Sequence, residues 1–395
     1  MNKQRRTLRL YNEEGDWAKP RTEGDRGERH ATWLELFFDL VFVVAIAELA
    51  HVLHDELTWA GIGNFAVLFL PVWWLWIDFS YYADQFDVDR GSYRLTMLGV
   101  MFGVIVLAIT IPEALHGGSA EFATVYAALR LIIIILYIQA WRFVRESREL
   151  TARYTISFSI AFVLWLISIV VPEPMRFVLW GIALFIEISN GPITYATIRL
   201  VPAQVSHMDE RFGLFVIIVL GEAILAVASG FTEENWQWHT AIAAISGFIA
   251  AVSLWWMYFE RTDTTVINQA LRGGKRALLL SYVYGYSHVF VFAGIVATGV
   301  GIQAGLEAAA ANEGLTIEAR TVLCGGVALF LLGLSAVQWA SPRSLPRQIL
   351  SVRLLSVLVC AVLIWFGILA PYILIGILAV ILVGLASFES LRWSH

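Results

Sequence analysis

Several ionisable side chains stand inside apolar segments of the chain, where they could bind a proton or a cation. Glu222 lies in the middle of the run VIIVLGEAILAV, while Arg130, Glu187 and His288 lie near the middles of other apolar runs and Glu48 slightly off centre in another. A charged side chain at a bilayer centre costs about 2.5–3.5 kcal/mol on insertion scales, so such residues normally face a protein interior or a water-filled cavity. Each is therefore a candidate for an ion pathway.

The stretch 33–51, WLELFFDLVFVVAIAELAH, carries four such groups on one predicted helix. Glu35 and Asp39 are four residues apart and share a face near one end, and Glu48 and His51 are three apart and share another face. A rise of about 1.5 Å per residue separates Glu35 from Glu48 by about 20 Å. The helix thus presents an inner acidic pair and an outer Glu/His pair.

Structural roles are open alternatives for most of these residues. Glu48 and Glu222 could be protonated carboxyls that each donate one hydrogen bond between helices. Arg130 is most simply the counter-ion of a buried acid, because an unpaired guanidinium at that depth would be intolerable. Five acids lie close enough to predicted helix ends to act as caps or as partners of nearby arginines: Glu35, Asp39, Asp78, Glu210 and Glu260.

The sequence contains no familiar catalytic or cofactor motif. It has no Walker A sequence, HExxH, GxSxG or TVGYG. Its three lysines, Lys3, Lys19 and Lys275, all lie outside the apolar runs, which excludes a retinal Schiff base. The run HVLHDE at 51–56 could bind a metal at helical spacing, but a solvated interfacial cluster is the favoured interpretation. We therefore predict no catalytic, cofactor or metal site, and an enzyme is the less favoured class.

The elements that must position these groups are membrane-spanning helices. Of the 395 residues 58% are hydrophobic and only 15% are charged, and the mean hydropathy is +0.70, which indicates an all-α polytopic membrane protein. Residues 1–33 are polar and predict a disordered cytoplasmic tail. Apolar runs of about 20 residues, the length that crosses a bilayer, predict twelve spans at 34–54, 59–82, 93–112, 121–142, 154–171, 175–197, 211–230, 237–259, 278–300, 320–340, 350–367 and 370–388.

The positive residues predict the orientation of these spans. With both termini placed in the cytoplasm, 24 of the 27 Lys and Arg residues fall on the cytoplasmic side. The outer loops hold only Arg176 and Arg320, and Arg130 lies within a span. Since positive residues are held on the inner side of a membrane, an even number of spans with both termini inside explains this distribution.

The two halves of the chain resemble each other around these acids. Glu35 precedes an apolar run to Glu48, and Glu210 precedes an apolar run to Glu222, with spacings of 13 and 12 residues. Such a match predicts that the first and seventh spans are equivalent and meet at a functional interface.

A second match lies one span further along each half. WWLWID ends at Asp78 and WWMYFE ends at Glu260. These matches predict a first six-helix repeat at 34–198 and a second at 199–395, parallel and related by an axis along the membrane normal, as in some secondary transporters. The alternative is a chance match between aromatic-rich spans.

Two segments carry a family resemblance. Residues 30–51 (HATWLELFFDLVFVVAIAELAH) and 207–225 (HMDERFGLFVIIVLGEAIL) resemble the signature segments of the low temperature requirement protein A family of bacterial membrane proteins. Further matches, WWLWIDFSYYADQFD, IPEA and YVYGYSHVFVFAGIVATGVG, extend the resemblance over most of residues 30–301, whereas the last 95 residues match only as apolar spans.

The resemblance implies a multi-pass protein of the bacterial inner membrane, first associated with growth at low temperature, and supplies no substrate. Glu48 stands where the family often has Gln, and Ala223 stands where Ser commonly follows the Gly-Glu pair. The first departure weakens a mechanism that requires a charged Glu48, and the second removes a hydroxyl near Glu222. The positions that match the family are Glu35, Phe37, Asp39, His51, Glu210, Arg211, Phe212, Gly221, Glu222 and His288.

The leading functional hypothesis is a secondary transporter or permease of unknown solute with a proton- or cation-linked acidic site near the midplane. In it Glu222, with Arg130 or His288 as partner, couples or selects the ion, Gly221 lets another backbone approach closely, and Asp78 and Glu260 form symmetric inner gates. Glu35 and Asp39 line the inner vestibule. The whole predicted pathway comprises Glu35, Asp39, Glu48, His51, Arg130, Glu187, Glu210, Arg211, Glu222 and His288.

Two other classes of function stay open. One is a protein that binds or modifies lipid, which would have a cavity opening sideways to the bilayer. The other is a sensor or assembly factor without substrate, whose buried acids would all be hydrogen-bonded in a dry core. The predicted partners are membrane lipid, a proton or cation, and a second copy of the chain, and no nucleic acid is predicted.

Overall fold

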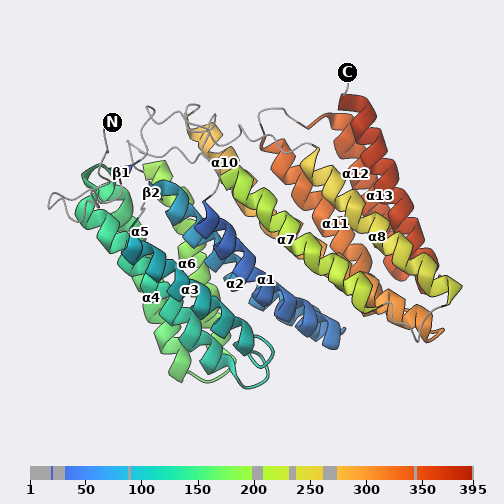
Figure 1. Ribbon diagram of the computed structural model, residues 1–395, viewed down its shortest axis with the longest axis horizontal. Helices are drawn as coiled ribbons and strands as arrows, with labels where there is room; N and C mark the ends of the chain where they lie inside the picture. Colours follow the sequence, from blue (N-terminus) through green and yellow to red (C-terminus); the bar gives the residue numbers. More distant parts are fainter. Residues whose placement is uncertain are drawn as a thin grey trace, which may run out of the picture.

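The computed structural model describes residues 19–20, 32–87, 90–197, 208–230, 237–260, 274–341 and 345–393. Most of the predicted tail therefore lies outside the described residues. The described part contains twelve helices long and apolar enough to cross a membrane, which confirms the predicted number of spans. They are α1 (Trp33–Asp55), α2 (Trp59–Gln85), α3 (Gly91–Thr110), α4 (Ser119–Phe143), α5 (Arg148–Val170), α6 (Met175–Thr197), α7 (Met208–Ser229), α8 (Trp238–Phe259), α10 (Gly274–Ala310), α11 (Ile317–Trp339), α12 (Arg347–Trp365) and α13 (Pro371–Trp393) (Figure 1).

Short polar signals begin and end these helices. Thr32 caps α1 by accepting a hydrogen bond from the Glu35 amide, while the Glu35 carboxylate accepts one from the Thr32 amide. This reciprocal capping box satisfies two amides that a helix N-terminus leaves free. This capping box agrees with the alternative interpretation of Glu35 as a helix-end group, and its place in an inner vestibule stays a prediction. A one-turn helix, η1 (Arg145–Ser147), leads into α5, and the two-residue strands β1 (Lys19–Pro20) and β2 (Phe86–Asp87) pair antiparallel.

Helix α10 is longer than the predicted span 278–300. It continues to Ala310 because the sequence GIQAGLEAAA is rich in helix formers and keeps an apolar face. Ile302, Leu306 and Ala309 on that face are buried. Hydropathy alone predicts only the most apolar part of this helix, whereas packing against neighbouring helices stabilises its whole length.

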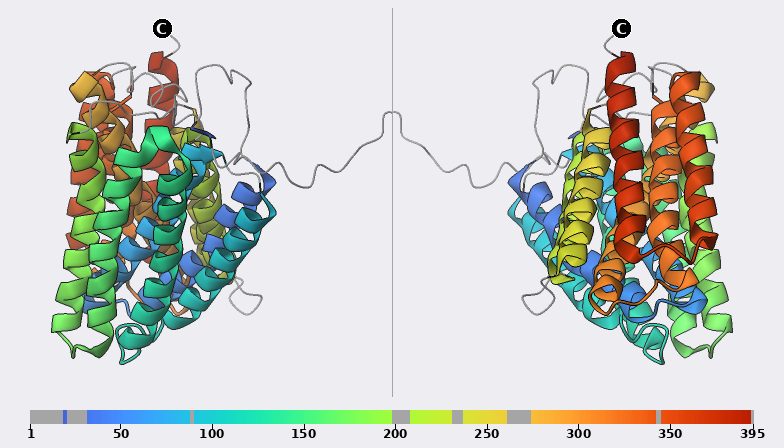
Figure 2. Two further views of the ribbon diagram at one scale, coloured as in Figure 1. Left: turned by 90° about the vertical axis from the view of Figure 1, so that its left-hand side faces the viewer. Right: turned by 90° about the vertical axis from the view of Figure 1, so that its right-hand side faces the viewer.

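The helices form two groups joined by α1 and α2. In one group α3, α4, α5 and α6 pack in sequence, and in the other α10 packs along α7, α8 and α11. Helix α1 contacts α3 on one side and α7 and α10 on the other, and α2 contacts α4, α7 and α10. Helix α1 begins and α13 ends at the same end of the bundle (Figure 1), and the helices run side by side in both views of Figure 2.

Helix pairing follows a similar pattern in the two halves. Helix α1 packs on α2 and α3 as α7 packs on α8 and α10, and the steps from α3 to α6 are matched by those from α10 to α13. This correspondence agrees with the predicted repeat. The repeat stays a prediction, because the contacts show which helices are neighbours and not that the two halves have a common origin. The predicted meeting of the first and seventh spans is confirmed by the α1–α7 contact.

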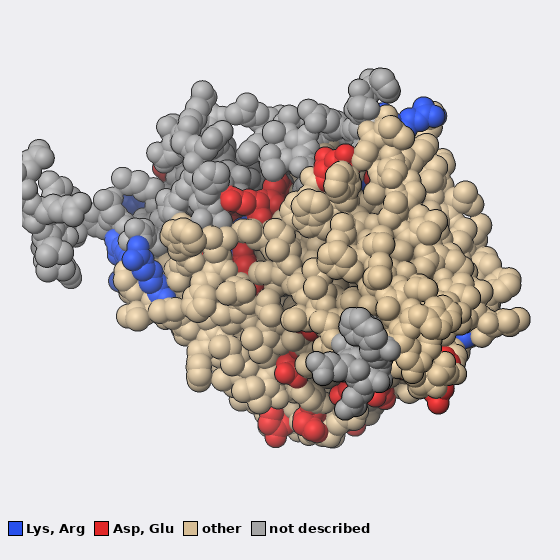
Figure 3. All heavy atoms as spheres, turned by 45° about the vertical axis from the view of Figure 1, so that its right-hand side comes forward, with Lys and Arg blue, Asp and Glu red and all other residues tan. Residues whose placement is uncertain are grey.

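The outer surface is broadly apolar. Large apolar side chains such as Ile160, Leu355 and Val380 are half or more exposed on α5, α12 and α13. Figure 3, in which the right-hand side of Figure 1 comes forward, shows a wide area without charged side chains and a gathering of Asp and Glu along its lower edge. An exposed apolar belt bounded by charge is the surface that a bilayer requires.

Aromatic rings fill the seam between the two helix groups. Trp76 of α2 stacks on Phe215 of α7 with ring centroids 4.3 Å apart, and Phe212 of α7 stacks on His288 of α10 at 4.0 Å. Phe292 meets Trp76, Phe212 and Phe215 from α10. This dry contact fixes α7 and α10 against α2, so the charged groups beside it are held in place.

The close approach of backbones on α7 lies two residues from its predicted position. A Cβ added at Gly221 would meet nothing within 4 Å, so the prediction of a close contact there is wrong. A Cβ added at Gly299 of α10, in contrast, would lie 2.8 Å from the Ala223 Cα. Helices α7 and α10 therefore pack tightly at the small pair Ala223 and Gly299, and the residue at 223 has no room to be large.

Candidate functional site

Three arginines, Arg130, Arg211 and Arg353, are buried within the helices, each next to at least one buried acid. A buried guanidinium is tolerated only when paired and hydrogen-bonded. The three arginines therefore mark three places where charged side chains are buried in the apolar interior.

The first pair joins the two halves of the chain. Arg211 of α7 donates to Asp39 of α1 through Nη2, 2.5 Å from Oδ1, and through Nε, 3.2 Å from Oδ2. Trp76 of α2 donates its indole N–H to Asp39 Oδ1 over 2.9 Å. Asp39 is fully buried, so its carboxylate faces Arg211 and Trp76, not the inner vestibule predicted for it. A bidentate pair with a third donor holds α1, α2 and α7 in one register.

The second site is a triad within the first half of the chain. Arg130 of α4 donates through Nη1 to Oδ2 of Asp78 on α2 over 2.5 Å, and its Nη2 lies 2.8 Å from Oε1 of Glu187 on α6. The guanidinium also lies 4.6 Å from the centre of the Phe158 ring on α5. The prediction that Arg130 is the counter-ion of a buried acid is confirmed, and its partners are Asp78 and Glu187 in place of Glu222.

The charges of this triad do not balance. Two carboxylates share one guanidinium, and all three side chains are buried. Both oxygens of Glu187, Nε of Arg130 and the hydroxyl of Tyr126 have no hydrogen-bond partner in the described part of the chain. Buried polar atoms are nearly always hydrogen-bonded, and a cluster of exceptions marks a site that can take up a further polar species. The triad therefore holds one more carboxylate than guanidinium.

The third pair lies in the second half and was missed by the sequence reasoning. Arg353 of α12 binds Glu389 of α13 through two bonds of 2.7 Å, from Nε to Oε1 and from Nη2 to Oε2. Its Nη1 also lies 3.4 Å from the Ser335 hydroxyl of α11. Arg353 lies at the start of the predicted span 350–367 and counts among the cytoplasmic positive residues, and Glu389 falls just beyond the last predicted span, so neither stood out as a buried charge.

The predicted centre at Glu222 lies elsewhere and is only partly buried. Glu222 makes no hydrogen bond or ion pair with the described residues, and His51 of α1 is within electrostatic range. Glu48 is also partly buried, and His51 is exposed. Glu222 and His51 therefore lie within electrostatic range of each other on neighbouring helices, and the triad comprises other residues.

His288 has other partners than Glu222. Its Nδ1 lies 2.8 Å from the Tyr284 carbonyl, which can only accept, so Nδ1 carries the proton. Nε2 lies 3.0 Å from the Tyr258 hydroxyl. Both ring nitrogens are therefore occupied in a fully buried aromatic cluster, an arrangement that fixes α8 against α10.

The two acids predicted as symmetric inner gates have unlike surroundings. Asp78 is buried in the triad, whereas Glu260 is exposed at the end of α8. The Glu260 carboxylate accepts hydrogen bonds from the Trp256 indole over 2.8 Å and from the Ser390 hydroxyl of α13 over 2.6 Å. Glu210, at the start of α7, is partly exposed. Asp78 and Glu260 therefore do not form a symmetric pair of gates.

The cluster at the outer end of α1 has neighbours besides its own helix. His54 Nε2 lies 3.1 Å from Glu307 of α10, and Nδ1 lies 3.5 Å from Asp55. Among the described residues no group of three or more His, Cys, Asp or Glu side chains has a geometry that could hold a metal ion. The His54–Glu307 contact ties the end of α1 to α10.

Comparison with known proteins gives a family and one relative. The profile of the family described as bacterial low temperature requirement A protein (LtrA) matches residues 30–387. The chain is also 31% identical over 350 residues to an uncharacterized protein of Rhizobium meliloti (strain 1021), an alignment that covers 82% of this chain and 84% of the relative. The match extends through α10 to α13, beyond the segments whose motifs carry the resemblance.

Proposed function

The chain belongs to the bacterial low temperature requirement A family of multi-pass inner-membrane proteins, and we propose that it is a proton-linked secondary permease. In this proposal the exchangeable proton is held by the triad of Asp78, Arg130 and Glu187. The solute is a small molecule whose movement is coupled to occupation of that site. The observation that carries the proposal is the second carboxylate beside a single buried guanidinium.

Charge balance supports a proton at this place. Two ionised carboxylates beside one Arg⁺ leave one uncompensated negative charge in a buried site, which the low-dielectric interior strongly disfavours. A proton or a cation removes this cost. Asp78 has a hydrogen bond from Arg130, whereas Glu187 contacts Arg130 as an ion pair at 2.8 Å that does not have hydrogen-bond geometry. Glu187 is therefore the member of the triad expected to bind and release the proton.

The position of the triad also favours movement over a purely structural role. Arg130 and Glu187 lie near the middles of α4 and α6, and Asp78 comes from α2, which contacts both helix groups. A proton bound at Glu187 changes the attraction among three helices at once. A sensor or assembly factor without substrate predicts that every buried acid is hydrogen-bonded, and Glu187 departs from that expectation.

The direct test is proton flux in vesicles. Purified protein is reconstituted into liposomes that contain a pH-sensitive dye, and a potassium diffusion potential drives protons inward. We expect the wild type to acidify the interior and Glu187→Gln to lose that flux, because the amide cannot exchange a proton at this position. Glu121→Gln is the matched control, since Glu121 lies exposed at the start of α4 and outside the triad.

A spectroscopic measurement tests the site without a known solute. With ¹³C-labelled Glu, the infrared carbonyl band of a protonated carboxyl shifts, and titration of the protein gives a labelled band that Glu187→Gln removes. A band unchanged in Glu187→Gln, or flux equal to that of empty liposomes in the wild type, contradicts the proposal. Flux that requires sodium and leaves the internal pH constant replaces the proton with a cation.

A further inference from the structure

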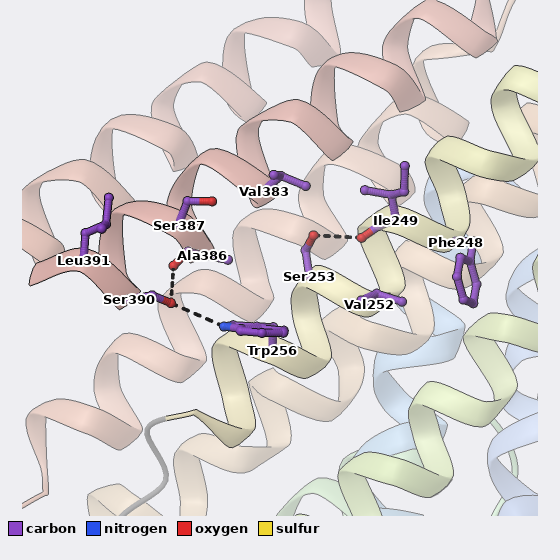
Figure 4. A pocket seen from close by; sticks show the side chains of 10 residues that line it. All are labelled: Phe248, Ile249, Val252, Ser253, Trp256, Val383, Ala386, Ser387, Ser390 and Leu391. Atoms are coloured by element: carbon purple, nitrogen blue, oxygen red, sulfur yellow. Dashed lines mark hydrogen bonds between the residues drawn. The ribbon is translucent and has the colours of Figure 1, made fainter. Parts of the chain in front are cut away.

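A lateral groove lies between α8 and α13, outside the buried ion pairs. It has a volume of about 580 Å³ and is lined mainly by apolar side chains, among them Phe248, Val252 and Val383. These three side chains are exposed on the outer surface of the bundle, so the groove opens sideways. Figure 4 shows side chains of both helices facing the groove along its length.

One end of the groove is polar. Trp256 of α8 and Ser390 of α13 meet across it, with the indole nitrogen 3.3 Å from the hydroxyl (Figure 4). Both donate to the same oxygen of Glu260, one turn beyond Trp256. In the middle of the groove the Ser253 hydroxyl donates to the Ile249 carbonyl of its own helix. The walls are therefore apolar, and the polar groups that remain gather at the Glu260 end.

The contacts of the Glu260 carboxylate within the described part of the chain are with neutral donors. Among the described residues it makes no ion pair, and its two hydrogen bonds come from neutral donors on α8 and α13. Its other carboxylate oxygen, Oε1, accepts no hydrogen bond from these residues. A carboxylate oriented in this way at the end of an apolar groove complements a molecule with a cationic head and an apolar tail.

We propose that this groove binds one phospholipid with an amine-bearing headgroup, whose ammonium contacts Glu260 and whose acyl chain lies between α8 and α13. Because lipid tails are as apolar as the groove, burial of the acyl chain gives little preference for the site over the surrounding bilayer. Selectivity therefore comes from the headgroup. The Lys and Arg distribution places this end of α8 at the cytoplasmic surface, so the lipid belongs to the inner leaflet.

The inference is independent of the proton-linked permease and is tested without a transport assay. Delipidated protein in detergent is titrated with phosphatidylethanolamine, phosphatidylcholine and phosphatidylglycerol of identical acyl chains, and bound lipid is counted by native mass spectrometry. We expect phosphatidylethanolamine to bind about tenfold more tightly than phosphatidylglycerol, the size of one charge-assisted hydrogen bond. Phosphatidylcholine, which has the charge but no N–H donor, falls between them.

Two variants separate the headgroup from the groove. Glu260→Gln is expected to abolish the preference for phosphatidylethanolamine while the acyl chain still binds weakly. Val252→Trp fills the groove and is expected to remove the tightly bound lipid whatever its headgroup. The controls are Glu146→Gln, an exposed acid in η1, and Val163→Trp, an exposed position on α5.

Each outcome decides the proposal. Loss of selectivity in Glu260→Gln and loss of bound lipid in Val252→Trp, with both controls unchanged, support it. Equal binding of the three lipids by the wild type overturns it, as does selectivity that survives in Glu260→Gln. A wild-type dimer that Val252→Trp dissociates, with no bound lipid, assigns the groove to a second copy of the chain and also overturns it.

Discussion

The two halves of the molecule place a buried arginine beside acids in different ways. In the first half Arg130 contacts two carboxylates from two other helices, and neither oxygen of Glu187 is hydrogen-bonded by the described residues. In the second half Arg353 contacts Glu389 by two bonds of 2.7 Å. A fully bonded pair of this kind braces two helices, whereas the triad leaves one carboxylate in excess of its guanidinium.

Removal of the central arginine is expected to have the largest effect. Arg130→Met leaves two buried carboxylates without a cation and is expected to lower the free energy of unfolding by about 5 kcal/mol, the upper end of the range for a broken buried pair. Arg353→Met leaves one carboxylate near the end of α13 and is expected to cost about 3 kcal/mol. Chemical unfolding in mixed micelles measures both values.

The difference between the two halves predicts that Arg130→Met lowers the free energy of unfolding more than Arg353→Met does. If Arg353→Met destabilises the protein as much as Arg130→Met, the charge excess in the first half has no energetic consequence. Leu131→Met, an exposed position next to Arg130 on α4, controls for the side chain introduced.

The pair between the halves gives the next largest effect. Arg211→Met leaves Asp39 buried with only the Trp76 donor and is expected to cost about 3–4 kcal/mol. The double variant Asp39→Leu/Arg211→Met removes both charges and is expected to regain most of that loss, because an apolar pair of similar volume often replaces a buried ion pair without penalty. A double-mutant cycle of unfolding free energies gives the coupling. Strictly additive losses would show that Asp39 and Arg211 do not stabilise each other.

The sharpest contrast between the halves comes from neutralising one acid in each. Glu389→Gln removes the carboxylate that contacts Arg353 in the described part of the chain and is expected to cost about 2 kcal/mol, the size of a lost charge-assisted pair. Glu187→Gln removes the excess charge while Arg130 keeps Asp78, so stability is expected to change by less than about 1 kcal/mol. The measurement is the same unfolding curve for each variant. A loss in Glu187→Gln equal to that in Glu389→Gln would make the triad a structural brace.

The helices themselves could be predicted from the sequence, because apolar length is a local property. All twelve spans and the contact between the first and seventh were predicted. The end of α10 at Ala310 was not, since that segment is held by packing and not by hydropathy. The Thr32 cap at the start of α1 follows from a short pattern that ends at Glu35.

The partners of the charged groups could not be predicted in the same way. Arg130 is 52 residues from Asp78 and 57 from Glu187, and Arg211 is 172 from Asp39. Such pairings depend on how helices rotate and cross, which no periodicity within one helix records. The sequence showed that Arg130 needed an acid but offered several. Glu222 was a candidate because it lies in the middle of its own span. The position of a residue along a helix does not show which face of that helix packs against the core.

The smallest effect is expected at the site that the sequence favoured. Glu222→Gln changes a partly exposed acid that has no hydrogen bond or ion pair among the described residues, so the unfolding free energy is expected to change by less than about 0.5 kcal/mol. Proton flux in liposomes is expected to stay at the wild-type level, because the triad and not Glu222 binds the proton. Loss of flux in Glu222→Gln with normal flux in Glu187→Gln would reverse this assignment. It would mean that an acid beside His51 at the α1–α7 interface carries the coupling, and that the charge excess at Arg130 is compensated without exchange.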